Sequence, residues 1–304
     1  MRKYLKPLGL ALAAVTLAAP PLAAQELSGT LKKIKDTGSI TIGHRDASIP
    51  FSYYDDKQQP VGFAMDICSQ VVDAIKTELK LAKIDVKYAL VTSANRIPLM
   101  ANGTIDLECG STTNNIERQK QVSFTNSHFV TASRYVTKKT NRIAKIDDLK
   151  GKTVVSTSGT TNIKQLNDVN TERKLGINVL PANGHAEAFL MVETDRAVAF
   201  VMDDILLASL VASSKTPAAY QISSDAFSPP EPYGIMLRRE DPAFKRAVDA
   251  ATAKIYKSGE IDKIYAKWFQ RPIPPKGLNL NLAMDPVLKK AFQNPTDSGD
   301  PAKY

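Results

Sequence analysis

The chain has 304 residues, of which 43% are hydrophobic and 23% charged, an ordinary globular composition that excludes intrinsic disorder. Its formal net charge is +9, but the basic residues are scattered and form no basic stripe interleaved with aromatic residues. This pattern disfavours a nucleic-acid-binding protein and favours a solvated basic surface that helps to gather anions.

The first 24 residues have the pattern of a secretory signal peptide. Arg2, Lys3 and Lys6 precede an apolar run over residues 8–19, and small residues ending at Ala24 form a cleavage site. The run is about 12 residues long, whereas a membrane-spanning helix needs about 20. No Cys lies near the cleavage point, which disfavours a lipid anchor. We expect cleavage after about Ala24, a net charge of +6, and an exported chain that is free in the periplasm.

Two cysteines, Cys68 and Cys109, are the only ones in the chain. Export permits a disulfide, but both lie in apolar segments, so a disulfide and two buried free thiols both remain open. The cysteines and the three histidines have no metal-ligand spacing, so we expect no structural zinc and no cofactor.

Strands and helices alternate along the chain. In the first unit, strands are predicted over 39–44, 86–91 and 105–109, with helices over 65–79, 95–101 and from about 115. In the second unit, strands are predicted over 153–157, 177–180, 197–202 and 220–222, with helices over 161–169, 186–193 and 204–213. A strand over 233–237 and helices over about 242–257 and 259–269 follow, before a Pro-rich tail. Such alternation predicts an α/β fold with mostly parallel sheets flanked by helices.

Two similar units, followed by a C-terminal segment long enough to return to the first unit, predict two lobes between which the chain passes twice. We expect the crossing strands near 133–137 and 228–233. The predicted division is a signal peptide over 1–24, a first lobe over 25–134 plus 232–304, and a second lobe over 135–231.

Anion-binding groups gather where the predicted strands end. The loop 110–113 leads into a helix that carries Arg118, and the turn 158–161 opens another helix. Free backbone N–H groups at helix starts bind anions, and a guanidinium group suits a carboxylate. Asp203, at the end of a buried strand, is placed to receive an ammonium group. Because ligands bind outside the carboxyl ends of parallel strands, these groups together predict a site for a zwitterion.

Each of these residues also has an ordinary structural role. Arg118 is equally suited to a solvated helix surface, and Asp203 is a good cap for a helix that begins at Asp204. Turns such as 158–161 are common without any ligand. The joint occurrence of these groups at consecutive strand ends is what favours a binding site.

Several runs resemble a known protein family: 43–45 with 50–54, 95–98, 108–118, 158–161, 196–204 and the ending 268–275. They resemble the periplasmic glutamate/aspartate-binding proteins of ABC transporters, over nearly the whole mature chain. The resemblance implies a two-lobed type II periplasmic binding fold that captures L-glutamate or L-aspartate by hinge closure. It further implies a monomer without enzymatic activity that delivers its ligand to a membrane permease.

The resemblance also implies roles for individual residues. Arg118, Thr113 and the turn at Thr160 and Thr161 would hold the α-carboxylate. Asp203 and Ser111 would receive the α-ammonium. The residues implied around the side-chain carboxylate are Arg45, Ser93, Arg96 and His185.

Charge counting supports an acidic guest. Arg45, Arg96 and Arg118 supply three positive charges and Asp203 one negative charge. A neutral amino acid would leave a buried Arg without a partner, which costs about 3–5 kcal/mol. If His185 contacts the carboxylate, its pKa should rise in the complex, and affinity should weaken as pH climbs through that raised value.

Two other functions fit the sequence less well. A glutamine binder has no need of both Arg45 and Arg96, and a dehydratase acting on a small acid needs a poised acid or base in the cleft. Glutamate and aspartate differ by one methylene, worth about 1–3 kcal/mol, and the sequence does not rank them.

Overall fold

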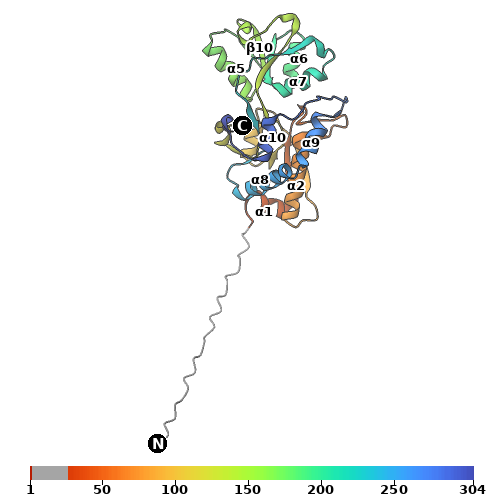
Figure 1. Cartoon of the computed structure of the whole chain (residues 1–304), viewed down its shortest axis with the longest axis vertical. Coiled ribbons are helices and arrows are strands. Elements are labelled where there is room, and N and C mark those ends of the chain that lie inside the picture. Colours follow the sequence, from red (N-terminus) through yellow and green to blue (C-terminus); the bar gives the residue numbers. More distant parts are fainter. Residues whose placement is uncertain (2–26) are drawn as a thin grey trace.

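The computed structural model describes Met1 and residues 27–304, so the predicted signal peptide and its cleavage after Ala24 lie outside the described residues. Figure 1 shows two lobes stacked along the long axis, joined by a narrow connection. The lower lobe holds the first and last parts of the described chain, and the upper lobe holds the middle. Within the described residues, no helix is long and apolar enough to cross a membrane.

The sheet of the first lobe has five strands in the order β5-β1-β6-β15-β7. These are β5 Asp85–Leu90, β1 Ser39–His44, β6 Leu107–Glu108, β15 Met236–Arg238 and β7 Val122–Phe124. β1 runs parallel to β5 and β6, and β15 runs antiparallel to β6 and β7, so the sheet is mostly parallel, as predicted. A small second sheet contains β2 Ala47–Ser48, β3 Ser52–Tyr54 and β4 Pro60–Val61.

The sheet of the second lobe repeats this plan in the order β11-β10-β12-β9-β13. Its strands are β11 Asn178–Ala182, β10 Thr153–Thr157, β12 Ala199–Asp203, β9 Ser133–Lys138 and β13 Tyr220–Ile222. β9 is the strand that runs antiparallel to both its neighbours. Both sheets therefore point the carboxyl ends of most strands toward the junction between the lobes.

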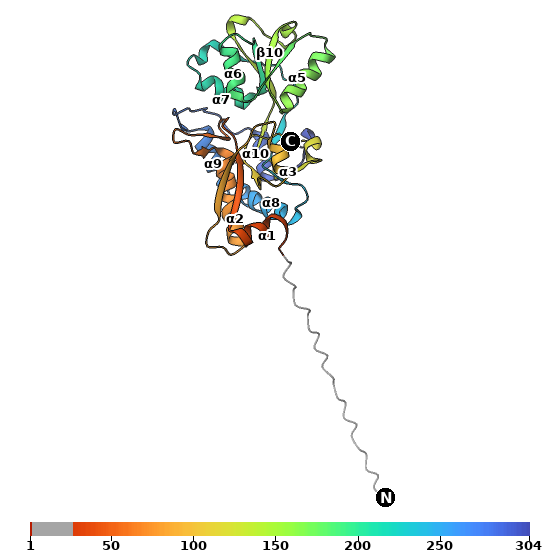
Figure 2. The same ribbon diagram turned by 180° about the vertical axis from the view of Figure 1, so that it is seen from behind.

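Helices cover the sheets, as Figure 2 shows from behind. The first lobe has α1 Gly29–Thr37, α2 Phe63–Glu78, α3 Arg96–Ala101, α4 Ile116–Gln119, α8 Pro242–Lys257, α9 Glu260–Phe269 and α10 Pro286–Gln293. The second has α5 Thr161–Glu172, α6 His185–Glu193 and α7 Asp204–Ser213. Short 3₁₀ helices occur at η1 Lys139–Asn141, η2 Ile146–Leu149, η3 Pro217–Ala219 and η4 Pro301–Lys303. α2 shows why the predicted spacing worked, since Ile67, Val71 and Ile75 form one fully buried stripe.

The connection between the lobes is a two-stranded antiparallel ribbon of β8 Phe129–Thr131 and β14 Glu231–Tyr233. The second predicted crossing, 228–233, overlaps β14. The first, 133–137, was wrong, because those residues form β9 inside the second sheet. Only Ala132 separates β8 from β9, and no Gly or Pro marks a break between them in the sequence. The predicted strand 233–237 is likewise two strands, β14 and β15, divided at Gly234 and Ile235. The division into 25–134 plus 232–304 and 135–231 stays our proposal for the lobes.

A disulfide joins Cys68 of α2 to Cys109, the residue after β6, with a Cα–Cα distance of 6.4 Å. Both residues are fully buried. The alternative of two free thiols is therefore excluded in this structure. The bond fixes the helix next to the loop that carries Ser111 and Thr113.

Candidate functional site

A small cavity lies at the junction of the lobes, where the carboxyl ends of the strands meet. Eight of the ten predicted site residues line it: Ser93, Arg96, Ser111, Thr113, Thr160, Thr161, His185 and Asp203. The other two, Arg45 and Arg118, contact this lining through Ser93 and Thr113. All ten predicted residues are thus brought together from two lobes and from segments far apart in the sequence.

The lobes are closed over this cavity, whose volume is about 10 Å³, room for about one water molecule. Arg118 Nη2 of the first lobe donates to the Gly159 carbonyl of the second lobe at 3.2 Å. The hydroxyl oxygens of Thr113 and Thr161 lie 3.4 Å apart across the same junction. A larger guest can enter only if the lobes separate.

Arg96, in the lining, and Arg45, which contacts the lining at Ser93, form a buried cationic wall beside the cavity. Arg45 donates from Nε to the Val91 carbonyl at 3.1 Å and from Nη2 to Ser93 Oγ at 3.0 Å. Arg96 donates from Nη1 to Thr112 Oγ1. Burial, followed by the charge of Arg96, lowers the pKa of Arg45 to about 10, which leaves it charged at neutral pH.

Several donors in this wall have nothing to bind. Arg45 Nη1, Arg96 Nε and Ser111 Oγ are buried and have no hydrogen-bond partner anywhere in residues 27–304. Buried polar groups are nearly always satisfied in folded proteins, and each orphan costs about 1–3 kcal/mol. Unsatisfied donors concentrated around one cavity point to an anionic guest.

Arg118 is held rigidly and is not the solvated helix charge that the sequence also allowed. Its backbone N–H donates to Asn115 Oδ1 at 2.8 Å, and its Nη1 donates to the Thr113 carbonyl at 2.8 Å. The side chain is 8% exposed, and burial, followed by the charge of Arg96, lowers its pKa to about 9. The predicted helix from about 115 is only the four-residue α4, so Arg118 lies on a tight turn.

Opposite Arg118, the turn before α5 presents a helix start to the cavity. Thr160 is the N-cap residue, and its hydroxyl accepts from the Ile163 N–H at 3.2 Å and donates to the Thr157 carbonyl at 2.7 Å. With that hydroxyl engaged, the turn offers backbone N–H groups and the Thr161 hydroxyl. An anion is stabilised there by the helix dipole.

Asp203 ends β12 and is buried at 3% exposure. Its carboxylate accepts hydrogen bonds from Asn162 Nδ2 at 2.8 Å and from the hydroxyl of Tyr233. The side chain makes no capping bond to α7, which excludes the simple capping role. Burial raises its pKa, and Asn162, Tyr233 and Arg118 oppose that rise. The residue is positioned as an acceptor for a cationic group in the cavity.

His185 is the first residue of α6, one residue earlier than the predicted helix start, and is 2% exposed. Its Nδ1 lies 2.9 Å from Thr157 Oγ1, which leaves Nε2 for the cavity. Burial, followed by the charges of Arg45 and Arg96, lowers its pKa well below the ordinary value. The imidazole is therefore neutral at neutral pH.

Some residues of the site were not predicted from the sequence. Asn162, Met202 and Leu206 complete the lining, and Tyr233 binds Asp203 from the hinge ribbon. The most important is Glu108, a fully buried carboxylate whose Oε1 lies 3.8 Å from Arg96 Nη1. The signal was present, because an acid inside the predicted buried strand 105–109 is unusual.

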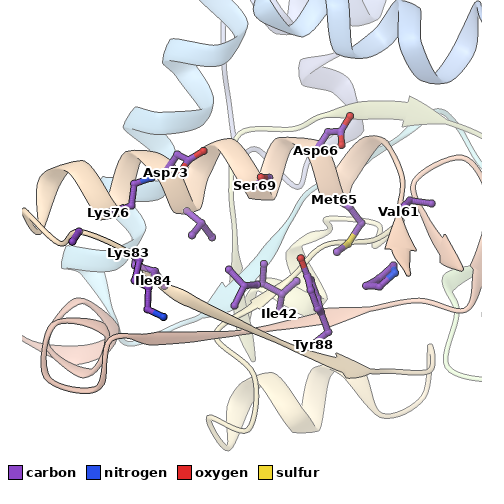
Figure 3. Close-up of a pocket in the computed structure, with 14 residues that line it drawn as sticks. Ile42, Val61, Met65, Asp66, Ser69, Asp73, Lys76, Lys83, Ile84 and Tyr88 are labelled. Carbon is purple, nitrogen blue, oxygen red and sulfur yellow. Dashed lines mark hydrogen bonds and ion pairs between the residues drawn. The ribbon is translucent and has the colours of Figure 1, made fainter. Parts of the chain in front are cut away.

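Two other grooves do not involve the predicted residues. One, of about 340 Å³, lies between α2 and β5 and mixes aliphatic residues with Asp66, Asp73, Lys76 and Lys83. Figure 3 shows Met65, Asp66, Ser69 and Asp73 along α2, with Ile42 and Tyr88 on the strands across the groove. The second groove, of about 720 Å³, lies behind the hinge and is mainly apolar. Within residues 27–304, no three His, Cys, Asp or Glu side chains cluster as a metal site.

The sequence of this chain is similar to a family of known binding proteins. The family profile of bacterial extracellular solute-binding proteins, family 3, matches residues 40–271. An L-glutamate/L-aspartate-binding protein of Pseudomonas aeruginosa is 52% identical over 95% of this chain and 96% of its own. A glutamate/aspartate import solute-binding protein of Escherichia coli is 46% identical over 90% and 91% of the two chains.

Solved structures show the same fold. A mutant of the arginine-binding protein ArgBP from T. maritima superposes with a TM-score of 0.70, at 28% identity, over 79% of this chain and 99% of that one. An ancestral amino acid-binding protein, described as a precursor of cyclohexadienyl dehydratase, superposes with a TM-score of 0.67 at 28% identity, over 79% and 99% of the two chains. The two-lobed α/β architecture predicted from the sequence is confirmed.

Proposed function

The chain belongs to the bacterial extracellular solute-binding proteins, family 3, and from that premise we propose that it captures L-glutamate and L-aspartate for an ABC importer. Its close relatives bear names that describe glutamate and aspartate binding or import, and they are binding proteins and not enzymes.

The observation that carries the proposal is the set of unsatisfied buried donors around one closed cavity. Arg45 Nη1 and Arg96 Nε belong to two guanidinium groups and have no acceptor within the described chain. A carboxylate between them accepts from both, and a carboxamide such as that of glutamine offers one neutral acceptor. This difference in charge favours an acidic side chain over a neutral one, because an unpaired buried cation costs several kcal/mol.

We assign three subsites to the cavity. The α-carboxylate lies between Arg118, Thr113 and the start of α5 at Thr160 and Thr161. The α-ammonium lies against Asp203 and Ser111. The side-chain carboxylate lies among Arg45, Ser93, Arg96 and His185. Support comes from the hydrogen-bond geometry: Asp203 is held by Asn162 and Tyr233 but caps nothing, and Ser111 Oγ has no partner within residues 27–304.

Capture works by hinge closure about the ribbon of β8 and β14. Ser111, Arg96 and Arg118 come from the first lobe, whereas Thr161, His185 and Asp203 come from the second. A ligand that contacts both sets favours the closed form by the free energy of the second-lobe contacts. Micromolar binding needs about 8 kcal/mol, well within the ceiling of about 1.5 kcal/mol per heavy atom for a ligand of this size.

The periplasm is the compartment that we propose, with the signal peptide cleaved after about Ala24. The partner is the membrane permease of an ABC transporter, and the binding protein acts as a monomer. An extracellular family and close relatives in glutamate/aspartate import support this placement.

Titration calorimetry of refolded, ligand-free protein against the twenty amino acids tests the proposal. We expect micromolar or tighter binding of glutamate and aspartate, and glutamine weaker by about a hundredfold or more, in line with the cost of an unpaired buried cation. A preference for glutamine, or no binding of either acidic amino acid, contradicts the proposal. The protein should release no product from either ligand during the titration.

A further inference from the structure

Glu108 is a buried acid that the three subsites do not use. Its side chain is fully buried on β6, and its Oε2 accepts from Thr112 Oγ1 at 2.6 Å. Thr112 Oγ1 in turn accepts from Arg96 Nη1 at 2.5 Å, so one hydroxyl links the carboxylate to the guanidinium. Oε1 has no hydrogen-bond partner in the described chain. A Cβ at Gly110 would lie 2.4 Å from Oε1, so the loop that leads to Ser111 closes directly over this carboxylate.

The electrostatic effect of Glu108 extends beyond Arg96 to the other two guanidinium groups of the site. Its negative charge acts on Arg45, Arg96 and Arg118, the three guanidinium groups of the site. His185 is neutral, and Asp203 supplies the second negative charge of the cavity. These five groups, Arg45, Arg96, Arg118, Asp203 and Glu108, carry three positive and two negative charges, a net charge of +1 for the set.

Two further acids, Glu231 and Asp46, act on Arg118 and Arg45 respectively and are not counted in this set of five groups. Glu231, on the hinge ribbon, accepts from Gln165 Nε2 at 2.9 Å. Asp46 follows Arg45 in the loop and does not line the cavity. Neither acid is substituted in the variants of Glu108, Thr112 and Arg96, so the direction of the expected changes in affinity does not depend on them.

We propose that Glu108 is a specificity-determining residue that sets the net charge of the cavity to match a guest of charge −1. The inference rests on the proposed function and deepens it. Glutamate and aspartate, with two carboxylates and one ammonium, bring the buried site to neutrality. Glutamine leaves it positive, and a dicarboxylate without an amine, such as glutarate, leaves it negative. A buried site discriminates strongly between these states, since Coulomb energies are large where water is excluded.

Replacing Glu108 by Gln tests this inference because the amide keeps the shape and the bond to Thr112 but removes the charge. The affinities of glutamine, glutamate and glutarate are measured by calorimetry for the wild type and for Glu108→Gln. In the variant the charged groups of the site have a net charge of +2. A guest with more negative charge should therefore gain affinity relative to a guest with less. The ratio of glutarate to glutamate affinity should rise by about tenfold or more, and that of glutamine to glutamate should fall.

A purely structural role predicts a different result. If Glu108 only positions Arg96, the substitution weakens the acidic guests together and leaves the glutarate-to-glutamate ratio unchanged, which overturns the proposal. Thr112→Val is the matched control, because it removes the linking hydroxyl and keeps the charge. We expect it to weaken glutamate and glutarate by similar factors.

A double variant keeps the inference testable if Glu108→Gln does not fold. Arg96→Gln with Glu108→Gln removes one charge of each sign and restores the net charge of +1. It should bind more weakly than the wild type yet keep the wild-type preference for glutamate over glutarate. A double variant that prefers glutarate contradicts the inference. Failure of the wild type to bind glutamate contradicts the proposed function instead, so the two failures are distinguishable.

Discussion

Gly159 of the second lobe lies against the backbone of Ala94 in the first lobe, so close that a Cβ at 159 would come within 2.5 Å of Ala94 Cα. Its φ of +75° is also a conformation that favours glycine. Arg118 donates to the carbonyl of this same glycine. The contact is therefore part of the closed form and has no role within either lobe alone.

We expect Gly159→Ala to hold the lobes apart, because the added methyl group meets backbone that has little freedom to shift. Glutamate affinity should fall by about a hundredfold, or about 2.7 kcal/mol, since ligand must now bind a strained closed form. Calorimetry gives the affinity, and small-angle scattering gives the shape with and without glutamate.

Gly176→Ala is the matched control for this substitution. Gly176 has a similar φ of +61°, but no atom lies within 4 Å of its added Cβ. It should lose about 1 kcal/mol of stability and keep its glutamate affinity. Equal affinities for the two variants would show that the contact with Ala94 does not govern closure.

Asp203→Asn removes the proposed partner of the α-ammonium and keeps the size of the side chain. Glutamate affinity should fall by about 2–5 kcal/mol, because the ammonium loses a buried counter-charge. Glutarate, which has no ammonium, should not weaken. Asp168→Asn removes an exposed carboxylate that pairs with Lys164 and should leave both affinities unchanged. If glutarate weakens as much as glutamate does, Asp203 is not the ammonium acceptor.

The pH dependence of binding depends on His185. In the structure its pKa is well below the ordinary value of 6.5, because of burial and of Arg45 and Arg96. A bound carboxylate raises the pKa again, so binding takes up a proton and affinity strengthens as pH falls. The affinity changes with pH only near the pKa that His185 has in the complex. Because Arg45 and Arg96 lower this pKa, we expect the change at a lower pH than for an ordinary histidine.

We therefore expect nearly constant glutamate affinity between about pH 6.5 and 8, and tighter binding below that until the ligand carboxylate protonates near its ordinary pKa of about 4.3. His185→Gln should abolish the tightening. Calorimetry at several pH values checks both. A wild-type affinity that already changes steadily between pH 6.5 and 8 would contradict this account.

His128 provides a test of stability. It is fully buried, and burial lowers its pKa to about 3 despite its hydrogen bond to the Gly110 carbonyl. The unfolded chain therefore binds a proton that the folded chain does not between its ordinary pKa of 6.5 and about 3. Stability from this residue is complete above pH 6.5 and is lost as pH falls.

Comparison with His128→Gln isolates this effect from the other titrating groups. Relative to the variant, the wild type should lose up to about 1.4 kcal/mol of unfolding free energy per pH unit below about pH 6.5. Denaturant unfolding at a series of pH values measures the difference. A difference that stays constant from pH 7 to 4.5 would mean that the pKa of His128 is the same in the folded and the unfolded protein.

The sequence predicted the parts of this site that lie at strand ends. Buried strands are visible as apolar runs, and their ends locate Ser111, Thr161 and Asp203 without tertiary information. Arg118 points inward because Asn115 and Thr113 accept its hydrogen bonds. Such contacts cannot be predicted from the pattern of neighbouring residues alone.

Other features depend on contacts across the fold. The first hinge strand was predicted at 133–137, within β9, because no Gly or Pro separates β8 from β9 in the sequence. Glu108 was missed because the charge count included only residues expected to contact the ligand. The pairing of Cys68 with Cys109 needs the distance between α2 and β6, which no spacing along the chain reports.

The cross-link between Cys68 and Cys109 spans 41 residues of sequence. Constraining a loop of that length removes chain entropy worth about 4 kcal/mol at room temperature. A newly made chain in a reducing compartment lacks this contribution, since thiols there stay reduced. Under the proposed export, the folded state of the precursor is correspondingly less stable, which favours an unfolded chain during translocation. Oxidation then fixes the ligand-binding loop only after the polypeptide has reached its destination.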